Sequence, residues 1–361
     1  MSAPSTCSSL AESSIQHPLI SLHSVYYTYD PDNSLDDRFD EISSDLYIKT
    51  MIIMLTKFLP IFLLLTLGIV VRKAHLFQEG FIDDLKKLVI NVVLPSILFL
   101  SFLTMELKIS YIALFISTIL FCFILYAAGL LLRRANICAH PYSEFFYTGF
   151  EFGMVGIALF TSMFGQEKLY AILLLDLGHE LFIWFFYAPA LQFKQEKTIK
   201  IGSVLRSFSS SPIIIAIISA LFLNSTNLYV LVQENLIITA IIQTLHLIAA
   251  MTSPLILLVI GYQLQFKRQG IFSAFKLIGL RLLIVGIFGT AFIYFTNAFI
   301  LPVDSLMLYA FITFLILPPP FIIPLFLPKK AHEENIFYNN ALVLYTLIML
   351  ILYSIIMLLL S

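Results

Sequence analysis

The chain has 361 residues, of which 60% are hydrophobic and 12% charged, and its formal net charge is −1. An ordinary soluble domain is about half apolar and about a quarter charged, so this composition excludes that class. The near-neutral charge predicts no nucleic-acid partner. The widely separated Cys7, Cys122 and Cys138 fit neither a disulfide framework nor a metal site. Hydrolase, ATPase and dinucleotide-binding motifs do not occur, so we expect neither enzymatic activity nor a cofactor.

The first fifty residues differ in composition from the rest of the chain. They are small, polar and acidic, as in the stretch DPDNSLDDRFDEISSD, and they lack the basic and apolar regions of a secretory signal. We expect residues 1–50 to be a disordered extension, or an upstream extension of a chain whose natural start is Met51. A regulatory tail is the functional alternative.

From Met51 onward, ten apolar blocks follow one another. A helix of about 20 apolar residues crosses a hydrocarbon core of roughly 30 Å. The sequence therefore predicts an all-α, multi-pass membrane domain over residues 51–361. The blocks are 51–71, 86–104, 109–132, 145–164, 169–192, 211–230, 236–264, 277–298, 305–327 and 338–360.

Basic residues alternate between the loops. Each loop after an odd-numbered block carries at least two Lys or Arg residues, whereas the loops after even-numbered blocks carry only Lys108 and Lys168. Basic residues in short loops mark the cytoplasmic side of a membrane. We therefore expect both ends of the ten-block domain on the non-cytoplasmic side, and we expect the protein in the plasma membrane.

Ten spans divide into two halves of five with opposite orientations, residues 51–192 and 211–361. That arithmetic is typical of an inverted repeat, with blocks four and nine at equivalent positions. Block four carries Gly149, Gly153 and Gly156, and block nine carries the stretch LILPPPFIIPLF. Successive prolines cannot sit in an unbroken helix because they lack N–H donors and their rings clash with the preceding turn.

Interrupted helices at equivalent positions indicate the binding site of a transporter. The alternative for the glycines is that they permit close helix packing. Block seven carries a further proline, and block eight carries an arginine that can either pair with an anion or reach the cytoplasmic interface. The predicted substrate-binding residues are Gly153, Gly156, Pro254, Arg281, Pro318 and Pro319.

Ionisable residues interrupt block five. Asp176, His179 and Glu180 share one helix face by their spacing of three and four residues. Charged groups at mid-membrane cost about 2.5–3.5 kcal/mol each on insertion scales, so they are usually functional. With Glu151 of block four they form our predicted ion-coupling set. The structural alternative is a hydrogen bond from His179 to Asp176, with Glu180 neutral or facing water.

Two aromatic residues follow this cluster in block five. Trp184 and Tyr187 approach the expected cytoplasmic end of the block. Aromatic side chains gather at membrane interfaces, so we interpret both as part of an aromatic belt.

Several motifs resemble those of the auxin efflux carrier family of permeases, within the bile-acid, arsenite and auxin type of transporter superfamily. They are LKKLVINVVLPSILFLSF in block two, EFGMVGIA followed by MFG in block four, SSPIIIAIISALFL in block six, MTSPLILLVIGYQL in block seven and LPPP in block nine. The resemblance covers residue 51 to the end of the sequence. It implies that spans four and nine unwind and cross near the midplane, and that a small organic anion is carried. Glu151 and Ala158 replace the asparagine and proline usual in the family.

We therefore expect a secondary transporter that moves a small organic anion, driven by a proton or sodium gradient. A cation/proton antiporter of the same fold without an organic substrate is the alternative. A membrane receptor or scaffold is a third, and the lack of a sizeable loop domain argues against it. The expected partners are the small organic anion, the coupling ion and the lipid bilayer, with no nucleic acid, and the alternative of a homodimer stays open.

Overall fold

The computed structural model describes residues 56, 59–78, 80–137, 140–196, 201–264, 271–326 and 332–360. The expected N-terminal extension over residues 1–50 lies outside these described residues. Within them the chain is helical and contains no β-strand. The fold class predicted from composition is confirmed at this level, as an all-α protein.

The helices coincide with the predicted apolar blocks, in the same order along the chain. An unlabelled helix covers 59–73, and the sixth block divides into two helices because Asn227 adopts a left-handed conformation with φ of 53°. The other elements are α2 (Phe81–Leu88), η1 (Val89–Val93), α3 (Leu94–Leu103), α4 (Ser110–Arg134), α5 (Ser143–Phe146), η2 (Phe152–Gly156), α6 (Ile157–Phe164), η3 (Gln166–Lys168), α7 (Tyr170–Phe182), η4 (Ile183–Tyr187), α8 (Ala188–Glu196), α9 (Ile201–Ser209), α10 (Pro212–Ser225), α11 (Leu228–Val232), α12 (Leu236–Ala250), α13 (Thr252–Gln263), α14 (Ile271–Phe299), α15 (Ser305–Ile316), η5 (Ile323–Phe326) and α16 (His332–Leu360).

Membrane-spanning length is reached by six helical segments in the described part of the chain. They are Phe81–Leu103, Ser110–Arg134, Tyr170–Gln195, Leu236–Gln263, Phe272–Phe299 and Ile336–Leu360. Shorter apolar helices cover Phe152–Phe164, Pro212–Ser225 and Ser305–Ile316. A helix of about 20 apolar residues is long enough to cross the hydrocarbon core, so the protein is a multi-pass integral membrane protein.

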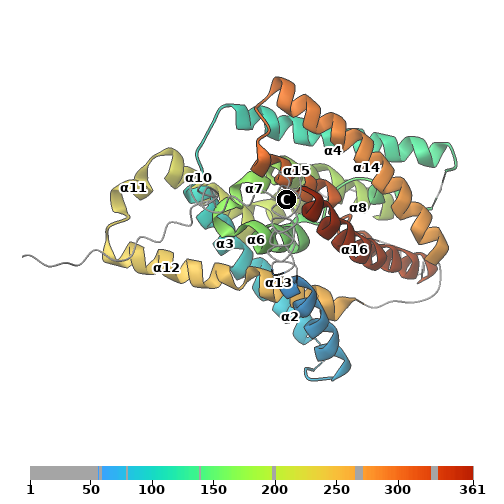
Figure 1. Cartoon of the computed structure of the whole chain (residues 1–361), viewed down its shortest axis with the longest axis horizontal. Helices are drawn as coiled ribbons and strands as arrows, with labels where there is room; N and C mark the ends of the chain where they lie inside the picture. Colours follow the sequence, from blue (N-terminus) through green and yellow to red (C-terminus); the bar gives the residue numbers. More distant parts are fainter. Residues whose placement is uncertain are drawn as a thin grey trace, which may run out of the picture. The chain divides into compact units, whose positions relative to one another are not determined.

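Two sets of helices make up the packing of residues 52–361 (Figure 1). In one set, α3 packs against α10 and α12, and α2 packs against α13. In the other set, α4 packs against α7 and α14, α14 packs against α16, and α15 packs against α7. α6 contacts α13 and α15, and so joins the two sets.

The helix over 59–73 crosses α13 at two glycines. A Cβ atom on Gly68 would lie 2.3 Å from the carbonyl oxygen of Leu258, and one on Gly261 would lie 2.1 Å from that of Leu65. Only glycine permits such an approach of two backbones. Arg72 extends the contact through Nη1, which donates to the carbonyl of Tyr262 at 2.9 Å.

A buried carboxylate on the short helix α5 connects it to α4 and α8. Glu144 is 2% exposed, and its Oε1 accepts from Nη1 of Arg133 on α4 at 2.7 Å. Lys194 on α8 donates to the same oxygen. Removing a carboxylate from water is costly unless it is paired, so these two cations allow α5 to carry a buried acid.

Candidate functional site

The fourth apolar block is interrupted between α5 and η2. Residues 147–151 leave the helical conformation, and Gly149 adopts a φ of 71°. A Cβ atom on Gly149 would also lie 2.9 Å from Cγ of Pro320. Glycine is therefore required there for two reasons, its left-handed backbone and the close approach of the proline ring.

The ninth apolar block is interrupted between α15 and η5. Residues 317–322 are not helical, and the interruption contains the triple proline of Pro318, Pro319 and Pro320. Prolines provide no N–H groups, so the carbonyls of the preceding turn lose their usual helical donors. All three prolines are buried, and those carbonyls need partners from elsewhere in the protein.

Glu151 joins the two interruptions by two hydrogen bonds. Its backbone N–H donates to the carbonyl of Pro318 at 2.7 Å, and its Oε2 accepts from the N–H of Phe321 at 2.7 Å. One residue of the fourth block therefore satisfies one carbonyl and one N–H of the ninth. The helix breaks that the glycines and prolines predicted meet in space.

Arg281 of α14 also binds both interruptions, through hydrogen bonds from its guanidinium group. Its Nη1 donates to the carbonyl of Phe146 at 2.7 Å. Its Nη2 donates to the carbonyls of Gly149 at 2.8 Å and of Leu317 at 3.1 Å. Phe146 ends α5, Leu317 directly follows α15, and Gly149 lies within the first interruption, so all three carbonyls lack a helical N–H donor.

The expectation that Arg281 reaches the cytoplasmic interface is wrong, because its side chain is 0% exposed. The expectation that it meets an anionic substrate is not supported either, because it lines neither of the cavities described below. The guanidinium instead binds backbone carbonyls of both interruptions, and it serves to hold them together.

The ionisable cluster of α7 is assembled as one unit. His179 Nε2 accepts from the N–H of Phe150 at 2.9 Å, so that nitrogen carries no proton. The proton therefore lies on Nδ1, which is 3.1 Å from Oδ1 of Asp176 and donates to it. The structural alternative for His179, a hydrogen bond to Asp176, is confirmed. The imidazole also links α7 to the interruption in the fourth block.

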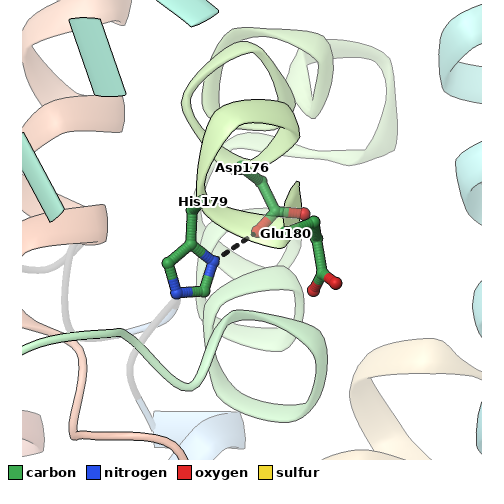
Figure 2. A group of neighbouring side chains, drawn as sticks. All are labelled: Asp176, His179 and Glu180. Atoms are coloured by element: carbon green, nitrogen blue, oxygen red, sulfur yellow. Dashed lines mark hydrogen bonds and ion pairs between the residues drawn. The ribbon is translucent and has the colours of Figure 1, made fainter. Parts of the chain in front are cut away.

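Glu180 lies beside this pair but points elsewhere. Figure 2 shows the three side chains leaving the same part of α7, with the imidazole of His179 on one side and the carboxyl of Glu180 on the other. Trp184 donates from Nε1 to Oε2 of Glu180 at 3.0 Å. One ligand atom from each of Asp176, His179 and Glu180 can be chosen so that all lie within 4.8 Å, a spacing compatible with a metal ion. Both nitrogens of His179 already have partners, which leaves the carboxylates as the available ligands.

A cavity of about 1150 Å³ lies between the two sets of helices, and we call it the large cavity. Of the predicted site residues, Glu151, Gly153, His179 and Glu180 line it. Exposed residues at its rim, including Gly80 and Asp83, come from the end of the bundle that carries the basic loops.

The other predicted residues lie outside the large cavity. Asp176 is buried and hydrogen-bonded to His179, and Pro318 and Pro319 are buried in the ninth block. Gly156 faces Leu317, whose Cδ1 would lie 2.8 Å from an added Cβ, so this glycine permits packing. Pro254 is exposed on α13 and lines neither cavity, which does not support its predicted substrate role.

Several cavity residues were missed or misassigned from the sequence. Trp184, interpreted as part of an aromatic belt, lines the large cavity. Tyr187 is not at an interface, because it is 0% exposed and donates to the carbonyl of Phe145 at 3.0 Å. On α16, Asn339 and Thr346 line the cavity. Their spacing of seven residues places both on one face of a helix that is mostly apolar after residue 335, and this is a signal that could have found them.

A second cavity of about 710 Å³ lies at the opposite ends of the same helices. On α3 it is lined by Ile97, Leu100 and Ser101, whereas the large cavity is lined by Leu94. On α7 it is lined by Leu174, whereas the large cavity is lined by His179 and Glu180. The helix segments between these positions separate the two cavities.

Comparison with known proteins adds no further constraint on this site. Neither protein-family models nor curated proteins matched the chain.

Proposed function

We propose that this membrane protein is a secondary active transporter that carries a small organic solute through the large cavity. The observation that carries the proposal is the position of Glu151, which lines the cavity and joins the two helix interruptions by hydrogen bonds. Interrupted helices present backbone groups and partial charges to a ligand, and transporters use them for binding at mid-membrane. An ordinary structural helix has no need of such a junction.

The proposal includes the finer architecture expected from the sequence, ten spans in two inverted repeats of five. It is supported by the helices that coincide with the apolar blocks and by the interruptions in the fourth and ninth blocks. Membership of the auxin efflux carrier family is part of the same proposal and depends on the motifs alone. The two cavities, at opposite ends of α3 and α7, fit access to the site from alternate sides.

Coupling is assigned to the carboxyl groups at the large cavity. Glu151, His179 and Glu180 line it, and Asp176 is hydrogen-bonded to His179. An organic anion, as the family resemblance implies, could bind beside two carboxylates only if these were protonated, so anion and proton would move together. The cluster within 4.8 Å favours a second candidate, an antiporter that exchanges a cation for protons.

The test is ion-driven flux in liposomes that contain the purified full chain. A pH gradient or a sodium gradient is imposed, and uptake of labelled organic solutes is followed beside ion movement. We expect one gradient to drive solute uptake, and we expect Glu151→Gln to abolish that dependence. The matched control is Glu234→Gln, because Glu234 is exposed and lines neither cavity.

Three results are informative against the proposal. Ion flux without dependence on any organic solute would select the cation/proton antiporter. Solute uptake that is unchanged in Glu151→Gln would remove the coupling role of this residue. Neither ion nor solute movement above protein-free liposomes would refute transport altogether.

A further inference from the structure

The charged groups of the large cavity have mostly one sign. In the described part of the chain its acidic lining residues are Asp83, Glu151 and Glu180, and its basic ones are Lys86 and His179. Lys86 is already compensated, because its Nζ lies 3.5 Å from Oδ1 of Asp83. That pair is partly exposed at the rim, and it leaves the carboxylates deeper in the cavity without a matching cation on the lining.

The other basic lining residue, His179, and the nearby Arg281 are also engaged. His179 is held neutral by its partners, since Nε2 accepts from a backbone N–H and Nδ1 donates to Asp176. Arg281 does not line the cavity, and its Nη1 and Nη2 donate to three backbone carbonyls. Among the described residues, therefore, none offers a cation positioned to bind an anion in this cavity.

Aromatic side chains form part of the same lining. Trp184 and Phe321 are partly exposed and contribute to the cavity, whereas Phe150 and Phe152 line it but are almost fully buried. Trp184 is also hydrogen-bonded to Glu180. The faces of aromatic rings attract organic cations, most strongly when water is excluded. An indole fixed beside a carboxylate provides both halves of a site for a cation with an apolar body.

The volume of the cavity is large enough for an occupant bigger than a bare ion. Ligand cavities are commonly about 300–1,000 Å³, and a volume of about 1150 Å³ therefore accommodates a small organic molecule. A metal or sodium ion requires only a compact cage of oxygen ligands. The walls here are largely apolar beyond the carboxylates and a few amide and hydroxyl groups.

We infer that the large cavity binds an organic cation, an amine or quaternary ammonium compound with an aromatic or apolar body. The charged group pairs with Glu180 and Glu151, and the body lies against Trp184. This inference rests on the proposed transport function and names its substrate class. It departs from the organic anion that the family resemblance implies, because an anion could bind beside these carboxyl groups only in their protonated form, whereas a cation pairs with them as carboxylates.

The experiment uses the single tryptophan of the chain, which is Trp184. Its fluorescence reports on the large cavity without any label. The purified full chain is titrated with phenyltrimethylammonium and, separately, with phenylacetate, which has a similar apolar body and the opposite charge. We expect a saturable change with the cation and an affinity for the anion that is at least about tenfold weaker. Ligand-dependent thermal stabilisation provides a second readout in the same samples.

Matched variants assign the binding to the carboxylate. Glu180→Gln keeps the size and a hydrogen-bond acceptor for Trp184 but removes the charge, so we expect the affinity for the cation to fall about tenfold or more. Glu234→Gln, an exposed position outside both cavities, is expected to bind like the unmodified chain. If Glu180→Gln does not fold, the comparison of cation and anion in the unmodified chain still decides the question.

The outcomes separate this inference from the proposed transport. Equal or tighter binding of phenylacetate would overturn it, and so would the absence of both a fluorescence change and a thermal shift with the cation. Binding of the cation without flux in liposomes would support the inference and refute transport. Flux of organic acids in a protein that does not bind the cation would support transport and refute the inference of a cation site.

Discussion

Arg281 provides the sharpest test of how the two helix interruptions are held. In Arg281→Met, the carbonyls of Phe146, Gly149 and Leu317 lose their guanidinium donors in a fully buried position. Each buried acceptor left unpaired costs about 1–3 kcal/mol, or roughly 3–9 kcal/mol for three. Removing a buried charge returns several kcal/mol of desolvation cost. We therefore expect a net destabilisation of about 3 kcal/mol.

The assay is thermal unfolding of the purified protein in detergent. In a chain of 361 residues each kcal/mol corresponds to roughly 1–2 °C, so the apparent Tm of Arg281→Met should fall by about 3–6 °C. Arg281→Lys should lie between this variant and the unmodified chain, because an ammonium keeps the charge but lacks the two-pronged geometry of guanidinium. The control is Arg134→Met, at an exposed arginine on α4. An Arg281→Met protein that melts together with this control would refute the reasoning.

Two further substitutions test the surroundings of the site by the same unfolding assay. Gly149→Ala should destabilise the protein by more than Gly80→Ala. Both glycines have positive φ, but a Cβ atom would meet the Pro320 ring only at Gly149, since nothing lies within 4 Å at Gly80. Equal losses of stability in the two variants would contradict the role of this contact. Glu144→Gln should cost about 1.5–3 kcal/mol because a buried charged acceptor is lost, whereas Glu106→Gln, at an exposed ion pair, should change stability by less than about 1 kcal/mol. Similar effects of these two substitutions would show that Glu144 is not a structural ion-pair partner.

The positions of the helices could be predicted from the sequence because a membrane-spanning helix must satisfy its length and its hydrogen bonds within one continuous segment. Apolar length decides whether a segment can cross the hydrocarbon core, and runs of glycine and proline decide where helical hydrogen bonding fails. The break after Phe146 and the break at Pro318 were therefore predictable. The left-handed residue Asn227, which divides the sixth block, was not recognised, since asparagine tolerates but does not require that conformation.

The roles of individual side chains were less predictable because they depend on which way each helix faces. Arg281 was placed near an interface by counting residues along its block, yet its face points to the interruptions. Trp184 was assigned to lipid headgroups for the same reason, although it contacts Glu180 across one helical turn. The contact between Glu151 and Phe321 joins residues 170 positions apart, and no local pattern contains that information.

The proposed transport is tested most directly by accumulation. Liposomes that contain the full chain are supplied with a labelled organic solute and an imposed ion gradient, and internal and external concentrations are compared with time. The account predicts that the internal concentration rises above the external one and falls back when an ionophore dissipates the gradient. Solute that only equilibrates, with or without the ionophore, would contradict secondary active transport.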